Sequence, residues 1–279
     1  MVAVAACLAA PSLAQPTDST TLGDRLAQID QMDALWAQRA APGPMDDLIR
    51  VGTEILAQHP DSYDATWRVS RAYWWIGHTT GDMAARTAAC SEGMRYGEEA
   101  IRLAPDGVEG HSVYALSVGE YATGIGIVQA VMQGIGQKFE RASLDVYALN
   151  RDYDNGTPIV ALGRYYYMLP WPLRDLNQSR RYLEEARQRH PQALWGRVYL
   201  AQTYYALGQE RAAKTELRAV LSLDPLPDKR PEDTPAKAAA MKQLVEWYGS
   251  ASNWSVPQSA RRVRREIREI RLNADCRWT

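Results

Sequence analysis

Apolar residues recur along the chain in pairs of helical stripes that glycine and proline separate. The clearest pair lies between Pro191 and Pro225, which are 34 residues apart, the period of a tetratricopeptide repeat. Ala201 and Ala213 are small at the positions where two helices cross closely. The other packing positions hold Leu194, Leu200, Tyr204, Leu217 and Val220. We therefore predict a helical hairpin that turns at Gly208 and ends before Pro225.

The same spacing recurs upstream, which predicts an array of such hairpins. Matching positions hold Val69, Ser70, Tyr73 and Gly77 after Pro60, Tyr114 and Ala115 after Pro105, and Leu162, Gly163 and Tyr166 before Pro191. The expected units are about 24–60, 63–105, 108–153, 156–191 and 194–225. We expect an extended linker over 226–235, and two helices near 236–249 and 257–272 within the closing segment 236–279. The predicted fold is an all-α solenoid with irregular insertions and a C-terminal capping helix pair.

The N-terminus resembles an export signal. An apolar run is followed by Ser12-Leu13-Ala14, a small-residue pattern that suits signal peptidase, so we expect residues 1–14 to be removed. Val4-Ala5-Ala6-Cys7 also resembles a lipobox, in which case Cys7 carries a lipid. An ordinary N-terminal helix of a cytosolic protein is the third alternative. The expected location is periplasmic, soluble or lipid-anchored, with no membrane contact other than a lipid on Cys7.

Composition adds a preference for aromatic rings with a polar edge. The chain has nine Trp and fifteen Tyr against one Phe, and such rings suit the walls of grooves and interfaces. Its net charge is −1, which gives no case for a nucleic-acid partner. Cys90 and Cys276 are an even pair that an oxidising compartment could join, although two separate thiols are the alternative.

Several short runs resemble a known family. Tyr-Asp-Asn-Gly at 153–156, Leu-Gly-Arg-Tyr-Tyr-Tyr at 162–167, Leu-Pro-Trp-Pro-Leu-Arg-Asp at 169–175 and Tyr-Leu-Glu-Glu-Ala at 182–186 are similar to the T-component family of TRAP transporters. The resemblance covers roughly 63–225. It implies a helical-repeat accessory protein that binds the solute-binding protein and assembles with itself. An organelle-associated group of eukaryotic microtubule regulators has a similar layout.

The first helix of each hairpin lines the concave side of such an array, which predicts a binding groove. The residues on that stripe are Asp64, Trp67, Arg71, Trp74, Arg164, Tyr167, Trp195, Gln202 and Tyr205. Trp, Tyr and Arg dominate binding energy at interfaces, although aromatic residues at this spacing also serve as packing. Trp171 lies in a turn between two prolines, and we expect it to fold back onto its hairpin rather than meet a partner.

Two further stretches have a structural and a functional interpretation. For the glycine-rich segment 124–136, we favour a buried helix with close crossings over a contact with lipid or another subunit. For the arginine-rich run at 261–271, we favour a helix that caps the array with a solvated face over a contact with an anionic membrane surface or nucleic acid, because Glu266 and Glu269 interleave with its arginines.

No catalytic motif emerges. The four histidines form no HExxH pattern, and the glycine runs match neither a P-loop nor a dinucleotide site. Asp152 to Gly156 has the glycine one position too early for a calcium loop, so we predict a turn. We therefore expect no enzyme, cofactor or metal, but an accessory protein that binds a solute-binding protein, an apolar ligand, or both. The alternative is a general scaffold for cell-envelope proteins.

Overall fold

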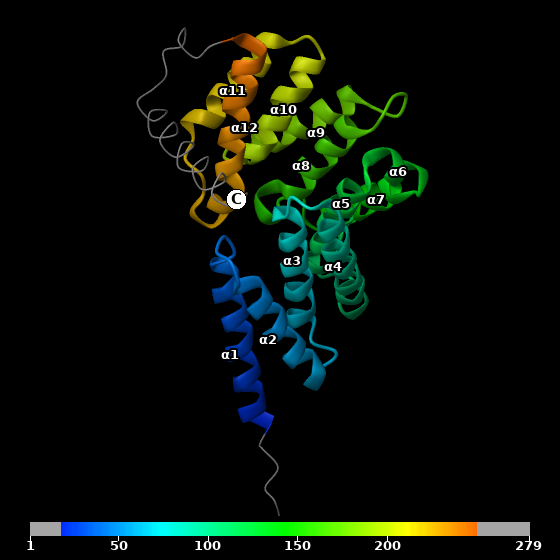
Figure 1. Cartoon of the computed structure of the whole chain (residues 1–279), viewed down its shortest axis with the longest axis vertical. Coiled ribbons are helices and arrows are strands. Elements are labelled where there is room, and N and C mark those ends of the chain that lie inside the picture. Colours follow the sequence, from blue (N-terminus) through cyan, green and yellow to red (C-terminus); the bar gives the residue numbers. More distant parts are fainter. Residues whose placement is uncertain (1–17, 250–279) are drawn as a thin grey trace, which may run out of the picture.

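The computed structural model describes residues 18–249, and it confirms the predicted all-α solenoid (Figure 1). The helices are α1 (Asp18–Ala37), α2 (Pro44–Gln58), α3 (Tyr63–Thr79), α4 (Met83–Leu103), α5 (Val108–Ile125), α6 (Ile127–Met132), α7 (Ile135–Asn150), α8 (Tyr153–Met168), α9 (Leu176–Arg189), α10 (Leu194–Ala206), α11 (Glu210–Ser222), the 3-10 turn η1 (Pro227–Lys229) and α12 (Arg230–Tyr248). Consecutive long helices pair as antiparallel hairpins that stack on one another.

Short polar side chains start several of these helices. The Ser62 hydroxyl accepts a hydrogen bond from the Ala65 N–H, and the Asp82 carboxylate accepts from the N–H groups of Ala84 and Ala85. Asp175 does the same for Gln178 at the start of α9. Each side chain satisfies backbone donors that have no partner inside the helix, so the local sequence fixes where these helices begin.

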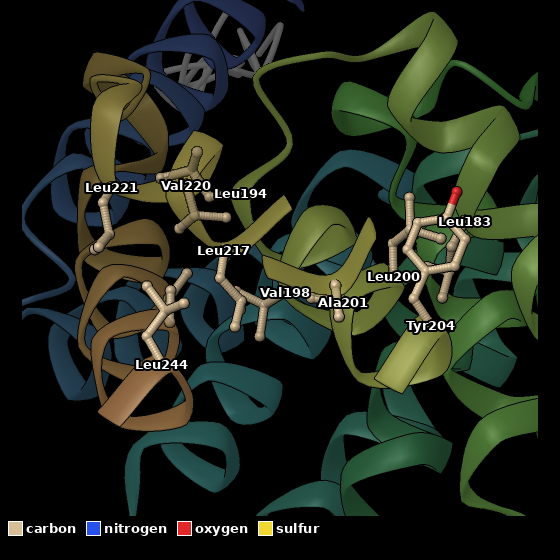
Figure 2. Packing of buried hydrophobic residues seen from close by; sticks show 13 residues of the cluster. Leu183, Leu194, Val198, Leu200, Ala201, Tyr204, Leu217, Val220, Leu221 and Leu244 are labelled. Atoms are coloured by element: carbon tan, nitrogen blue, oxygen red, sulfur yellow. The ribbon is translucent and has the colours of Figure 1, made fainter. Parts of the chain in front are cut away.

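The hydrophobic core is divided along the array, as a repeat architecture requires. One cluster, formed by α9 to α12, includes the positions that the 34-residue spacing had selected (Figure 2). Leu200, Ala201, Ala213, Leu217 and Val220 have no exposed surface. A second cluster, built on Met32, Leu48, Val69 and Trp75, joins α1 to α3. The prediction of the packing seam is confirmed for the fifth hairpin.

Glycines allow the closest helix crossings. A Cβ atom added at Gly97 on α4 would lie 2.9 Å from the Cα of Tyr114 on α5. Gly208 has a φ of +73° and follows α10, which ends at Ala206, so the predicted turn is confirmed. Gly156 follows Asp154 and Asn155, which also have positive φ, and this confirms the turn predicted over 152–156.

The two ends of the described array meet. Arg39 follows α1, and its guanidinium binds the carboxylate of Glu232 on α12, with Nε to Oε1 at 3.0 Å and Nη2 to Oε2 at 2.7 Å. Nη2 also donates to the backbone carbonyl of Asp228. Figure 1 shows the start of α12 above the top of α1. The solenoid is therefore closed across its concave side.

Two expectations about local structure differ from the structure. The expected extended linker over 226–235 is helical from Arg230. Pro231 lies in the first turn, where proline costs no hydrogen bond, and the helix accommodates Pro235 inside it. The expected buried helix over 124–136 is wrong. Gly126 and Gly134 have positive φ and isolate the six-residue helix α6, which leaves Val128 67% and Met132 82% exposed.

Candidate functional site

The concave side of the array holds a cavity of about 570 Å³. Most of its wall comes from the first helices of the hairpins, α3, α5, α8 and α10, and residues of α1, α4, α6, α7, η1 and α12 add to it. The volume falls within the range of about 300–1,000 Å³ that small-molecule sites occupy. The ion pair between Arg39 and Glu232 holds the end of α1 next to the start of α12. Because Glu232 also lines the cavity, this pair sets the distance between the two helices at its border.

Four of the predicted groove residues line the cavity: Arg71, Trp74, Arg164 and Trp195. Trp74 stacks on His78 with ring centroids 5.3 Å apart. The Trp195 indole N–H donates to the Glu232 carbonyl at 2.7 Å, so this ring also holds the start of α12. The helical stripe had therefore selected four residues that line this cavity, although some of its members also support the fold.

The remaining predicted groove residues lie outside the cavity wall. Trp67 is 8% exposed and lies beneath Arg71, at 4.6 Å from the guanidinium carbon to the ring centroid. Asp64 is an exposed ion-pair partner of Arg68 at 3.0 Å. Tyr205 stacks on Trp247 with centroids 4.0 Å apart. These residues belong to packing and to the outer surface.

Arg71 is a partly buried cation whose charge is matched inside the protein. Its Nη2 lies 3.2 Å from Asp33, and its guanidinium lies 4.1 Å from the centroid of Trp36. Burial lowers the pKa of Arg71 to about 10, against the opposing effect of Asp33. Its Nε is buried and has no hydrogen-bond partner within residues 18–249.

Arg164 is held differently. Its Nη1 donates to the amide oxygen of Gln202 at 2.6 Å, and its guanidinium carbon lies 4.4 Å from the Tyr199 centroid and 5.1 Å from that of Tyr167. Burial lowers its pKa, and no carboxylate contributes to the shift. Gln202 and Tyr167, both predicted site residues, therefore act as supports of Arg164.

Sequence reasoning missed the carboxylates of the site. Glu120 on α5 lies 2.7 Å from Arg86 Nη1 and 2.7 Å from His78 Nδ1. Asp154, in the left-handed turn, pairs with Lys229. Asp233 is 6% exposed and its Oδ2 has no partner in the described part of the chain, so burial, reinforced by Glu232, raises its pKa to about 7. Nothing in the periodicity places these residues together, because they lie on elements far apart in the sequence.

The expected fold-back of Trp171 onto its hairpin is wrong. Trp171 is 90% exposed, so it does not fold back. The turn is fixed instead by backbone hydrogen bonds from the N–H groups of Leu173 and Arg174 to the Pro170 carbonyl and from the Asp175 N–H to the Tyr166 carbonyl. Leu173 is 53% exposed, and Arg174 lies 4.3 Å from the Tyr167 ring centroid. The turn presents two neighbouring apolar side chains to solvent.

Cys90 is a buried thiol between α4 and its neighbours, with no exposed surface, and burial raises its pKa to about 12. Cys276, the export signal at 1–14, Cys7, the helix near 257–272 and the arginine run at 261–271 lie outside the described residues. Over 18–249, no three potential metal ligands gather in one place, and no helix has the length and apolar content to cross a membrane.

Similarity to known proteins agrees with this architecture. Residues 28–170 match the family described as regulator of microtubule dynamics protein 1-3, and residues 173–244 match a tetratricopeptide-repeat family. A thermophilic tetratricopeptide protein of Thermus thermophilus is similar in structure, with a TM-score of 0.58, 15% identity and coverage of 78% of this chain and 99% of that one. The MamA protein has a TM-score of 0.47, 12% identity and coverage of 79% and 96%. No curated protein gives a significant match.

The first match spans 143 residues, from 28 to 170, which is just over half of the 279-residue chain. It covers the hairpins from α1 to α8, and the repeat match covers those from α9 to α12. The chain therefore belongs to the regulator of microtubule dynamics protein 1-3 family and is a tetratricopeptide-repeat protein.

Proposed function

We propose that this protein is a non-catalytic binding protein that holds an apolar ligand in the concave cavity and presents it to a protein partner. The cavity carries the proposal. Leu116, Val131, Phe139, Val160 and Leu169 line it, so a ligand there would remove apolar surface from water on both sides. Tetratricopeptide proteins generally act as interaction scaffolds, which supports the second half of the proposal.

The ligand half can be tested with a neutral fluorescent probe, N-phenyl-1-naphthylamine, whose emission rises in an apolar site. Ala161→Trp and Gly136→Leu place larger side chains into the cavity wall. Ala88→Trp is the matched control, because Ala88 is exposed on α4. We expect the unmodified protein and Ala88→Trp to bind the probe, and both filling variants to lose at least about tenfold in affinity while keeping their helicity. Equal binding by all four proteins contradicts a ligand site in the cavity.

We propose more specifically that the protein is an exported T component of a TRAP-type uptake system and that its partner is a solute-binding protein. The resemblance over 162–175 supports this form, and the exposed Trp171 and Leu173 in the same run offer a contact for the partner. A periplasmic location, with or without a lipid on Cys7, belongs to the same proposal. Self-association also belongs to it.

Affinity capture from a periplasmic extract tests the proposed link to a TRAP transporter. The bait is residues 15–279, and the comparison is the same chain with Trp171→Ala and Leu173→Ser. Enrichment of one solute-binding protein by the first and not by the second supports the transporter link. Capture of unrelated envelope proteins by both favours the general scaffold.

The family description favours a second candidate, binding to microtubules. Co-sedimentation with polymerised tubulin tests it directly. We expect the protein to stay in the supernatant if its partner is a solute-binding protein. Salt-sensitive pelleting that saturates with tubulin concentration would favour the second candidate instead.

A further inference from the structure

The cations around the cavity are each paired with a carboxylate, with one exception. The cationic side chains of its wall, apart from histidine, are Arg71, Arg86, Arg164 and Lys229. Three of them have a carboxylate of this chain: Asp33 for Arg71, Glu120 for Arg86, and Asp154 for Lys229. Within residues 18–249, Arg164 has no carboxylate partner, and its recorded acceptor is the neutral amide of Gln202.

A partly buried guanidinium without a counter-ion is costly, because burial removes some of the water around the charge and the protein returns only one hydrogen bond and two aromatic faces. The remaining N–H groups of Arg164 are not among the buried unpaired nitrogens, and the residue lines the cavity, so its guanidinium keeps donors that are accessible to solvent. An arginine offers a planar fork that matches a carboxylate with two parallel hydrogen bonds.

The surroundings of Arg164 are apolar. Val160 and Met168 lie one turn before and after it on the same face of α8, and both line the cavity. Phe139 and Val131 continue the wall from α7 and α6. A ligand that reaches the guanidinium therefore contacts hydrocarbon side chains next to its charged end.

The charge count limits the ligand to a single negative charge. Asp33, Glu120 and Asp154 already pair with the other three cations of the wall, and Glu232 pairs with Arg39. Glu120, Asp154 and Glu232 line the space that the ligand would occupy. A dianionic phosphate would leave one charge unmatched among these carboxylates. A monoanionic carboxylate needs only Arg164.

We propose that the cavity takes a single-chain amphiphile with a terminal carboxylate, and that Arg164 binds the carboxylate while the apolar wall binds the chain. This inference rests on the proposed function, since it names the ligand class of the same cavity. Gln202 is a positioning residue, because it orients the guanidinium through Nη1 and leaves the rest of the fork to the ligand.

The test compares dodecanoate with 1-dodecanol, which shares the chain and lacks the charge, by titration calorimetry on the delipidated full-length chain. Arg164→Gln removes the cation, Arg164→Lys keeps the charge without the fork, and Arg174→Gln is the matched control. Arg174 also lies over Tyr167, at 4.3 Å from the ring centroid, but it is exposed and does not line the cavity.

We expect the unmodified protein and Arg174→Gln to bind dodecanoate at least about tenfold more tightly than dodecanol. Arg164→Gln should weaken dodecanoate by about ten- to a hundredfold and leave dodecanol unchanged, and Arg164→Lys should fall between. Removing two methylenes should weaken binding roughly tenfold in every variant. The ratio of the two affinities within one variant is insensitive to a general loss of stability.

Two outcomes overturn the inference in different ways. If acid and alcohol bind equally to the unmodified protein, or if Arg164→Gln keeps the preference for the acid, the assignment of Arg164 fails and the proposed function stands. If neither amphiphile binds, and the neutral probe does not bind either, the proposed function fails with it.

Discussion

Arg39 and Glu232 are 193 residues apart in the sequence and form a two-pronged ion pair, with nitrogen–oxygen distances of 3.0 and 2.7 Å. Their side chains are 5% and 14% exposed. A solenoid gains its stability from contacts between neighbouring repeats, so a contact between its first and last described hairpins is an addition to the repeat plan. This ion pair fixes the position of Glu232, which lines the cavity.

Arg39→Ala should destabilise the protein strongly. The variant leaves Glu232 without its partner in a buried setting and removes the packing of the guanidinium on Trp36 and Trp75, so we expect a loss of about 3–5 kcal/mol in the free energy of unfolding. Urea denaturation followed by circular dichroism measures it. Arg50→Ala is the control, because Arg50 forms only exposed pairs with Asp47 and Glu54 and should change stability little. Equal effects of the two substitutions contradict a buried closure.

Asp233 should make stability fall as pH rises from about 4 to about 7. Its pKa in the folded state is about 7 because of burial, while the unfolded carboxyl titrates near 3.8. Between these values the folded state binds the extra proton, so raising the pH favours unfolding, by no more than about 4 kcal/mol in total. Denaturation of the unmodified protein and Asp233→Asn across this range should give stability curves that diverge with rising pH. Parallel curves would show that Asp233 ionises normally.

Truncation to alanine should lower the stability of the protein strongly at one tryptophan and hardly at all at another. Trp75 is 6% exposed and its indole N–H donates to the Arg39 carbonyl at 2.8 Å, so Trp75→Ala should cost about 3–5 kcal/mol. Trp171 is 90% exposed, and Trp171→Ala should change the free energy of unfolding by less than about 0.5 kcal/mol. Thermal melts of the two variants decide the matter, and a large loss of stability for Trp171→Ala would restore the fold-back interpretation.

The close crossing of α4 and α5 gives a test of helix packing. Gly97→Ala would push a Cβ atom to 2.9 Å from the Cα of Tyr114, and we expect it to cost about 1–3 kcal/mol. Gly23→Ala, on α1, meets nothing within 4 Å and should stabilise its helix by up to about 1 kcal/mol. Should both substitutions stabilise the protein, α4 and α5 do not cross at Gly97.

Sequence periodicity predicted the fold well because the repeat imposes its own packing rule. The small residues Ala201 and Ala213 and the turn at Gly208 occupy the places expected of them. Periodicity also found Arg71, Trp74, Arg164 and Trp195, since the first helices of a solenoid share one concave side. Sequence periodicity did not predict Glu232 and Asp233 as cavity residues. They lie on α12 and reach the cavity only through the curvature of the whole array, which no local pattern reveals.

The errors have local physical causes. Trp171 was expected to fold back, but backbone hydrogen bonds satisfy its turn without burying the ring. The apolar composition of 124–136 suggested burial, yet two glycines with positive φ cut the segment to one short helix. Trp67 and Trp195 share the stripe of the groove and also hold the fold, so composition alone could not separate their roles.

A crystal structure of the full chain with N-phenyl-1-naphthylamine bound is the most direct test of the central claim that the concave cavity is the ligand site. We expect electron density for one probe molecule within the space bordered by Trp74, Phe139 and Tyr199, with the Arg39–Glu232 pair closed. Density only on the outer surface, around Trp171 or Met132, with the cavity empty, would contradict the account.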